Sequence, residues 1–408
     1  MSDPKGMGLS WGVGGSRREM RRRRNFPTVQ DLREGARRRI PAFAFEYADC
    51  GVGSDLNVRR NAQAFDAVEI VPRYGVDRDD ITTAVTLFGR DYSAPFGIAP
   101  MGLPSMIWPG AEIALGHAAQ KARIPYIAGC VGGCEIERLG VIAPDVLWFQ
   151  LYRIPDGDHK VGFDLVRRAQ RAGAHALVLT LDVPMRSKRP REIRNRLAVP
   201  FQPGLRTIYE VASSPAWLAA LMRNGQPGFA NLTAYVDASA GKGEVAEFVS
   251  RQMRGAFTWE EVARYRELWK GPLVVKGIMH PEDARKAIAV GVDGIQVSNH
   301  GGRQFEPAPA AIDVLPAIAQ AAGDKATILF DSGIRSGVDV LRALALGAQT
   351  AFAGRAFLFA LGAIGDEGAG YVVDMLSEEI HTAFRQAGIH DSAQARSLNL
   401  RHPAALQF

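Results

Sequence analysis

The sequence predicts an α/β protein, a (β/α)8 TIM barrel, on three observations. Eight short apolar runs end in glycine or polar residues, at 96–102, 125–130, 146–152, 176–182, 272–278, 294–299, 327–333 and 350–356. Most of the intervals between these runs have apolar residues at helical spacing. The runs themselves are apolar almost throughout, as strands are when helices cover both faces of a parallel sheet. Eight such units in 408 residues, of which 47% are hydrophobic, predict one closed barrel.

The helices between the strands are predicted from periodicity and end signals. Helical spacing is present in "EIALGHAAQKARI" (112–124), "GFDLVRRAQRAGA" (162–174), "PEDARKAIAVG" (281–291) and "GVDVLRALALGA" (337–348). Pro281 and Ser336 are start signals, and glycines follow the ends. These stretches are the expected outer layer of the barrel.

Two segments lie outside the regular alternation, within a single expected domain at 26–408. Residues 26–95, which precede a first strand starting near residue 95, look helical at first, and we expect them to close the barrel bottom or approach its mouth. A link of about 90 residues follows the fourth strand, and we expect 200–257 to be an insertion that covers the active site. Its segment "AWLAALMR" (216–223) suits a membrane surface, packing on the barrel top or a subunit contact.

The positive charge is concentrated at the N-terminus. Residues 1–24 hold seven basic and two acidic side chains, which accounts for +5 of the net charge of +6. We expect residues 1–25 to be a disordered basic tail, with attraction to anionic lipid as the alternative. A nearly neutral body excludes a nucleic-acid-binding fold, whose charge lies on the folded surface.

Other classes of protein are disfavoured by what the sequence lacks. The three cysteines, Cys50, Cys130 and Cys134, are odd in number and lack zinc-site spacing, so we expect free buried thiols in a reducing compartment. The sequence has no uncharged apolar run of the roughly 18 residues that span a bilayer, so we expect a cytoplasmic protein, with contact to the inner membrane surface as a further option. No His, Asp or Glu group has metal-ligand spacing, and "GVGG" (12–15) follows no strand, so neither a metal site nor a nicotinamide site is expected.

Polar residues gather at the ends of the predicted strands. In this fold those ends converge on one mouth, where catalysis is expected. The residues concerned are Gln150, Tyr152, Thr180, Asp182, Lys276, Ser298, His300, Arg303, Asp331, Gly333, Arg335, Gly354 and Arg355. Six consecutive strand ends with such residues predict an active site.

Two groups within this set differ in chemistry. "DSGIRSG" (331–337) and "GRAF" (354–357) combine backbone N–H groups, helix starts and two arginines, which suits a phosphate. His300 with Asp182 suits a general base, and Arg189 with Arg303 suits a carboxylate. Lys276 suits an electron-accepting ring. Together they predict proton abstraction from a small carboxylic acid beside a phosphorylated cofactor.

These residues resemble the FMN-dependent α-hydroxy acid oxidoreductases, the family of glycolate oxidase and of lactate and mandelate dehydrogenases. The resemblance spans about 27–390 and rests chiefly on "SNHGGRQ" (298–304), with "FEYADCG" (45–51), "APMG" (99–102), "FQLY" (149–152) and "SKRPREIRNR" (187–196). It implies FMN as the cofactor and oxidation of an L-2-hydroxy acid to the 2-oxo acid. It also implies an oligomer, since relatives form tetramers.

The resemblance assigns a role to each residue. His300 would be the base, Asp182 its partner, Arg303 and Arg189 the carboxylate ligands, and Tyr152 and Tyr47 would position carboxylate and hydroxyl. The flavin contacts would come from Pro100, Met101, Gly102, Gly129, Gln150, Thr180, Lys276 and Ser298. The ribityl and phosphate contacts would come from Asp331, Ser332, Gly333, Arg335, Gly354 and Arg355.

Departures from the family pattern bear on substrate and acceptor. Gly129 stands where a flavin-contacting serine is usual, and Val131 where an aromatic residue is frequent, which predicts a wider substrate pocket than glycolate needs. Gly102 and "DSG" resemble the bacterial dehydrogenase branch and favour a quinone or another carrier over oxygen. The insertion, at 200–230, matches the segment that anchors some relatives to membranes. An oxidase, a diphosphate isomerase with reduced flavin and a catalytically degenerate scaffold are the alternatives.

Overall fold

Eight parallel strands close into a barrel in the computed structural model, which describes residues 16–76, 80–197, 204–237 and 241–408. Around the barrel the order is β10–β11–β4–β5–β6–β7–β8–β9. The strands are β4 (Phe96–Ile98), β5 (Tyr126–Gly129), β6 (Leu147–Leu151), β7 (Leu177–Thr180), β8 (Leu273–Ile278), β9 (Gly294–Val297), β10 (Thr327–Asp331) and β11 (Thr350–Ala353). Each lies within one of the eight apolar runs, and the predicted fold is confirmed.

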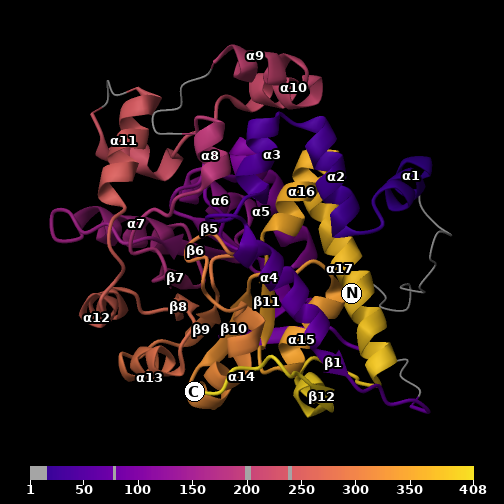
Figure 1. Ribbon diagram of the computed structural model, residues 1–408. Coiled ribbons are helices and arrows are strands. Elements are labelled where there is room, and N and C mark those ends of the chain that lie inside the picture. The colour runs from indigo at the N-terminus through magenta and orange to yellow at the C-terminus, as the bar shows by residue number, and fades with distance from the viewer. Residues whose placement is uncertain (1–15, 77–79, 198–203, 238–240) are drawn as a thin grey trace.

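Helices surround the barrel (Figure 1). They are α5 (Ala111–Ala122), α6 (Ile136–Ile142), α7 (Lys160–Arg171), α12 (Trp259–Leu268), α13 (Pro281–Ala289), α14 (Ala311–Ala322), α15 (Gly337–Ala345), α16 (Arg355–Ile364) and α17 (Gly368–Ala387). The start signal at Ser336 forms a capping box with Asp339 at α15. On α7, Leu165, Val166 and Ala169 are buried, which is the apolar stripe that the periodicity predicts.

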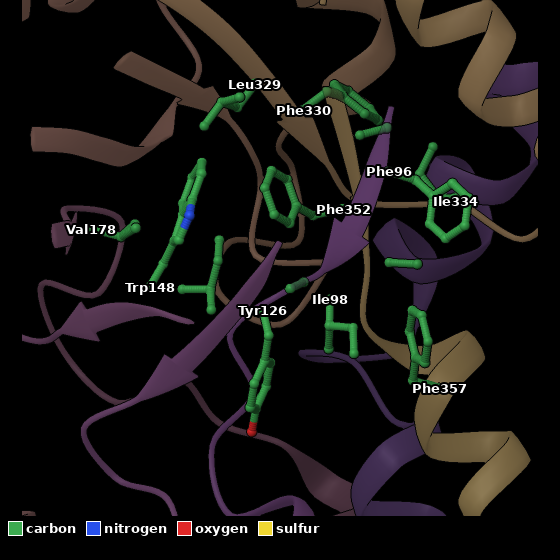
Figure 2. Close-up of a cluster of buried hydrophobic side chains, with 14 of the residues drawn as sticks. Phe96, Ile98, Tyr126, Trp148, Val178, Leu329, Phe330, Ile334, Phe352 and Phe357 are labelled. Carbon is green, nitrogen blue, oxygen red and sulfur yellow. The ribbon is translucent and has the colours of Figure 1, made fainter. Parts of the chain in front are cut away.

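Large side chains fill the barrel interior (Figure 2). Trp148 of β6 and Phe352 of β11 meet with their ring centroids 5.7 Å apart. The hairpin of β2 (Val85–Leu87) and β3 (Arg90–Tyr92) closes the end at which the strands begin, since Phe88 packs on Trp148 and the Trp148 indole N–H donates to the Tyr92 hydroxyl at 2.9 Å. The opposite end is left for the site.

The start of the chain differs from the prediction for residues 1–25. Residues 1–15 lie outside the described residues, but residues 17–25 form helix α1 (Arg17–Asn25), capped by Ser16 and Glu19, instead of a disordered tail. Arg22 pairs with Glu367, and Arg23 pairs with Glu378 of α17. Ion pairing with acidic residues some 350 positions away gives the arginine run partners that the local sequence does not reveal.

The rest of the N-terminal segment reaches both ends of the barrel. After α2 (Val29–Arg39), helix α3 (Ala42–Asp49) approaches the mouth, and α4 (Leu56–Ala64) packs beside α14. The hairpin β2–β3 lies at the bottom, as described above. Near the C-terminus, β12 (Leu400–Arg401) pairs antiparallel with β1 (Glu69–Ile70).

In the described residues of the long link between β7 and β8, four α-helices precede α12. These are α8 (Pro190–Arg194), α9 (Leu205–Ala212), α10 (Pro215–Asn224) and α11 (Lys242–Gln252). In Figure 1, α9 and α10 lie at the upper edge of the molecule, above α3. The Trp217 ring of α10 meets Phe43 of α3 edge-on, and its indole N–H donates to the Ile107 carbonyl at 3.0 Å. None of the described helices combines the length with the apolar character that a membrane span requires.

The three cysteines are buried and free. Burial raises the pKa of the Cys130 thiol to about 12 and that of Cys134 to about 11. These thiols are therefore protonated near neutral pH, which makes them poor nucleophiles.

Candidate active site

A cavity of about 890 Å³ opens where the strands end. Strand ends, helix α3 and the helices α9, α10 and α11 supply its walls. Most residues predicted for the site line it: Tyr47, Pro100, Met101, Gly102, Tyr152, Arg189, Lys276, His300, Arg303, Asp331, Ser332, Gly333, Arg335, Gly354 and Arg355. The structure thus brings together side chains that are up to 308 positions apart in the sequence.

Five predicted residues are not among those that line this cavity. Asp182 and Ser298 lie behind cavity residues, bonded to His300 and Lys276 respectively. Gln150 donates to the Thr180 hydroxyl at 2.8 Å, and both are buried. Gly129 lines a separate cavity of about 10 Å³, next to Met101.

His300 and Asp182 form the pair that suits a general base. Nδ1 of His300 lies 2.9 Å from Oδ1 of Asp182. Because a carboxylate only accepts hydrogen bonds, Nδ1 carries the proton and Nε2 has the lone pair. Nε2 lies 3.3 Å from the Tyr152 hydroxyl, which donates to it. His300 lines the cavity, so its unprotonated nitrogen, Nε2, is the candidate base of the site.

The electrostatic environment favours a neutral His300 and an ionised Asp182, as a general base requires. Burial lowers the pKa of His300, and the charges of Lys276 and Arg189 lower it further, against the opposing effect of Asp182. Burial acts to raise the pKa of Asp182, but His300 and Lys276 outweigh it, so that this pKa is lowered. A neutral imidazole against an ionised carboxylate is the arrangement that accepts a proton and stabilises the resulting cation.

Gly277 sets the position of Asp182. Its φ is +97°, and β8 has an irregular register between Lys276 and Ile278. A Cβ at residue 277 would lie 2.6 Å from the Asp182 side chain, so only glycine fits this bulge. Sequence reasoning missed this residue, although a glycine inside the strand pattern "LVVKGI" is a signal for a bulge.

Asparagines hold the loop that carries His300. The Asn299 amide donates to the side-chain oxygens of Asn57 and Asn61 of α4, at 2.8 and 2.7 Å. Gly302 packs so closely on α4 that a Cβ there would lie 2.7 Å from the Val58 nitrogen. Sequence reasoning missed this support because α4 is more than 230 residues away from the loop.

A second cluster joins Arg189, Arg303 and the tyrosines. The Arg303 guanidinium lies over the Tyr47 ring at 5.3 Å and donates to the Tyr47 and Cys50 carbonyls. The Tyr47 hydroxyl donates to the Gly102 carbonyl at 2.8 Å. Both arginines also donate to Glu192 of α8, at 2.8 Å from Arg303 and 3.0 Å from Arg189. Glu192 was not predicted, although its place three residues after Arg189 is an ion-pair spacing.

Lys276 belongs to a buried polar network behind the cavity. Its Nζ lies 2.7 Å from the Ser298 hydroxyl and 3.2 Å from Oδ2 of Asp331. Ser298 donates to the other Asp331 oxygen, and Gln296 donates to Oδ2 at 2.7 Å. Gln296 was also missed, although a glutamine within the apolar strand "GIQV" is an informative exception. The network fixes the Lys276 charge at the cavity wall.

The residues after β10 and β11 suit a phosphate. Burial, together with the charges of Arg303 and Arg335, lowers the pKa of Arg355 to about 9, and burial also lowers that of Arg335. An anion at this site would offset the clustering of positive charge. Arg355 donates from three nitrogens to the carbonyls of Ala48, Gly301 and Cys50, so it also ties α3 to the His300 loop.

Glycines shape the wall beside Met101. A Cβ at Gly102 would have no neighbour nearer than 3.5 Å, and at Gly354 none nearer than 3.7 Å, so both positions open onto the cavity. A Cβ at Gly129 would lie 3.1 Å from the Met101 carbonyl oxygen. A serine at 129 would crowd this backbone, which gives a physical reason for the glycine. An arginine-containing end that suits a phosphate, an open wall and a lysine held by hydrogen bonds fit the parts of a flavin mononucleotide.

Comparisons with known proteins agree with this geometry. Residues 36–402 match the family model described as FMN-dependent dehydrogenase. The L-lactate dehydrogenase of Caulobacter vibrioides is 35% identical over 369 residues, which are 90% of this chain and 95% of that protein. A putative L-lactate dehydrogenase of Mycobacterium tuberculosis is 36% identical, over 89% of this chain and 86% of that protein.

Solved structures give the same picture. The crystal structure of the monotopic membrane protein (S)-mandelate dehydrogenase superposes with a TM-score of 0.86 at 33% identity, over 92% of this chain and 99% of that chain. A crystal structure of mandelate oxidase with (S)-4-hydroxymandelic acid has a TM-score of 0.80 at 34% identity, with the same coverage of each chain.

Proposed function

The chain belongs to the FMN-dependent dehydrogenase family, with FMN as its cofactor, and from this premise we propose that it oxidises an L-2-hydroxy acid to the 2-oxo acid. The observation that carries the proposal is the position of the His300 ring. Its Nε2, with Asp182 behind the ring, is on a wall of the cavity that Arg189 and Arg303 also line. A base beside a carboxylate site is what removal of hydrogen from a hydroxy acid requires.

Each residue has one task in the proposed mechanism. Arg189 and Arg303 bind the substrate carboxylate, while Tyr47 and Tyr152 orient it and the hydroxyl. His300 accepts a proton at Nε2, and Asp182 stabilises the resulting imidazolium. When bound, FMN would supply the ring that takes up two electrons and the second hydrogen of the substrate. Lys276 places a positive charge where negative charge arrives, and Gly333, Arg335, Gly354 and Arg355 hold the phosphate.

The remaining cofactor contacts are proposed on the family resemblance. We propose that Pro100, Met101 and Gly102 face the flavin ring, with Gly129, Gln150, Thr180 and Ser298 at its edge. Asp331 and Ser332 contact the ribityl chain. The open positions at Gly102 and Gly354 support this placement.

The substrate is proposed to be lactate-like or mandelate-like. Relatives named as L-lactate dehydrogenases and structures named for mandelate support both. Val131, Met106 and Leu221 give the cavity an apolar wall, which accommodates a side chain larger than that of glycolate. Simple glycolate is therefore not the proposed substrate.

The electron acceptor is proposed to be a quinone or another carrier, reached at a membrane surface. Helices α9 and α10, within 200–230, expose Leu205, Tyr209 and Met222, which supports peripheral contact there. Oxygen is the alternative acceptor, favoured by the likeness to mandelate oxidase.

The wider organisation is proposed on the family resemblance. Residues 26–408 form one domain in which 200–257 cover the active site, consistent with α9, α10 and α11 lining the cavity. The chain is a cytoplasmic homotetramer, peripheral to the inner face of the membrane. Light scattering after size exclusion gives the mass of the assembly, and fractionation of cells gives its compartment.

Anaerobic spectroscopy tests the proposed reaction. The purified yellow protein is mixed with L- and D-2-hydroxy acids, aliphatic and aromatic, and absorption of the oxidised flavin is followed. We expect an L-acid to bleach it and the D-acids to leave it yellow. A protein that refuses FMN, or that no acid of the panel bleaches, contradicts the proposal. Reoxidation by oxygen or by a quinone analogue then identifies the acceptor.

A further inference from the structure

Glu192 is a buried carboxylate on the wall of the carboxylate site. Its side chain is 6% exposed, and one oxygen, Oε1, accepts from both Arg189 and Arg303. The Cys50 thiol lies 3.7 Å from the same oxygen. Glu192 is also among the residues that line the cavity. The two arginines proposed to bind the substrate therefore already share one negative charge.

The charges in this group do not cancel. Two guanidinium groups, 13% and 17% exposed, face a single carboxylate, which leaves one positive charge in excess among these three side chains. The charge of Arg355, which also acts on Arg303, is assigned to the cofactor phosphate. Arg186 lies 3.7 Å from Oε2 of Glu192, but it is 54% exposed and therefore screened by water. One bound carboxylate would neutralise this excess positive charge.

The local structure holds Glu192 in this position. Arg189 is the N-cap of α8 and Pro190 its first residue, so the single turn places Glu192 beside the Arg189 side chain. The pKa of Glu192 is lowered, since Arg189 and Arg303 outweigh the effect of burial, which acts to raise it. The carboxylate is thus ionised at neutral pH.

We propose that Glu192 is a specificity-determining residue that limits the site to substrates with a single carboxylate. It neutralises one arginine charge, fixes both guanidinium groups, and repels a second acidic group on the ligand. A hydroxy acid with one carboxylate restores local neutrality, whereas a dicarboxylate brings one negative charge too many into a buried site. This inference rests on the proposed function, in which Arg189 and Arg303 bind the substrate carboxylate.

Binding of unreactive acids to the FMN-loaded enzyme tests the proposal without catalysis. Butyrate and succinate have the same number of carbons and differ by one carboxylate. Their dissociation constants are read from the perturbation of the visible flavin spectrum. We expect native enzyme to bind succinate at least about tenfold more weakly than butyrate, because of the charge on Glu192. In Glu192→Gln, which keeps the shape and loses the charge, this ratio shifts at least about tenfold towards succinate.

Two further variants separate charge from structure. Glu192→Asp keeps the charge and is expected to keep the preference for butyrate, even where binding of both acids weakens. Glu137→Gln removes a carboxylate that also pairs with an arginine, Arg168, but does not line the cavity, and it is expected to keep the native ratio. If Glu192 had only a structural role, Glu192→Gln would weaken the binding of butyrate and of succinate equally.

The outcomes distinguish this inference from the proposed function. An unchanged ratio in Glu192→Gln overturns the role of Glu192. If that variant does not retain FMN, equal binding of the two acids by native enzyme, or loss of the preference in Glu192→Asp, overturns it instead. Arg303→Met is expected to lose butyrate binding, and if it binds butyrate like native enzyme, the carboxylate site itself is wrong. If Arg303→Met loses butyrate binding and the succinate-to-butyrate ratio is unchanged in Glu192→Gln, only the specificity role of Glu192 is overturned.

Discussion

Two sides of the cavity differ in the side chains that form them: the floor at the ends of the barrel strands, and the cover formed by helices α9, α10 and α11. On the floor, polar side chains at the strand ends are fixed by partners, as in the Lys276–Ser298–Asp331 network. On the cover, apolar side chains face the cavity at Val211 and Leu221, while others face outward at Leu205, which is 87% exposed, and Met222, which is 79% exposed. The floor suits chemistry that needs fixed geometry, and the cover suits contact with apolar groups. Changes to the floor should therefore alter catalysis much more than changes to the outer face of the cover.

The largest effect is expected for His300→Ala. Loss of the base should slow flavin reduction by L-2-hydroxy acid by about 10²–10⁴-fold. Because the proposed phosphate and ring contacts come from other residues, the protein should remain yellow. Anaerobic stopped-flow absorption measures the rate, and the spectrum of the resting enzyme measures FMN content. Reduction at the native rate would show that the floor does not act through this histidine.

A smaller effect is expected for Gly277→Ala. The new Cβ would press on Asp182 and strain a backbone whose φ is +97°. We expect a loss of about 1–3 kcal/mol in the free energy of unfolding and roughly tenfold slower flavin reduction, because His300 is misplaced.

Gly173→Ala is the matched control for that change. Its φ is +80°, and a Cβ there would have nothing within 4 Å. It should lower stability through backbone strain alone and leave the reduction rate unchanged. Equal slowing in both variants would mean that Gly277 does not act by positioning Asp182.

The pH dependence is the third expectation and involves a change of a few fold. The pKa of His300 is lowered from 6.5, mainly by burial. The neutral base therefore persists as the pH falls through 6.5, and the rate of flavin reduction should decline only below this value. The same shift lowers stability on acidification, because the unfolded chain takes up a proton that the folded protein resists. A reduction rate that already halves near pH 6.5 or above argues against a lowered pKa.

The smallest effect on chemistry is expected on the outer cover. Replacing Leu205, Tyr209 and Met222 by serine removes exposed apolar surface that does not line the cavity. Reduction by a dissolved hydroxy acid should stay unchanged, while co-sedimentation with vesicles that contain anionic lipid should fall. Slower reduction in this variant would mean that floor and cover are not separable.

The same contrast explains which features could be predicted from sequence. The floor was predictable because parallel strands end at one mouth, so His300, Lys276 and Arg335 could be placed together from their positions alone. The supports of the floor were harder to predict, because Gln296 and Asn61 act through contacts that only the folded chain brings together. Glu192 has a local partner in Arg189, but its contact with Arg303 also depends on the fold. The helix at 17–25 was missed for the same reason, since its arginines pair with Glu367 and Glu378 near the other end of the chain.

The most direct test of the central claim is a crystal structure of the FMN-loaded enzyme with an unreactive 2-oxo acid. We expect a carboxylate bonded to Arg189 and Arg303, the α-carbon next to Nε2 of His300, and the FMN phosphate at residues 333–335 and 354–355. A carboxylate bound away from these arginines, or an FMN whose ring lies away from Lys276, would contradict the claim.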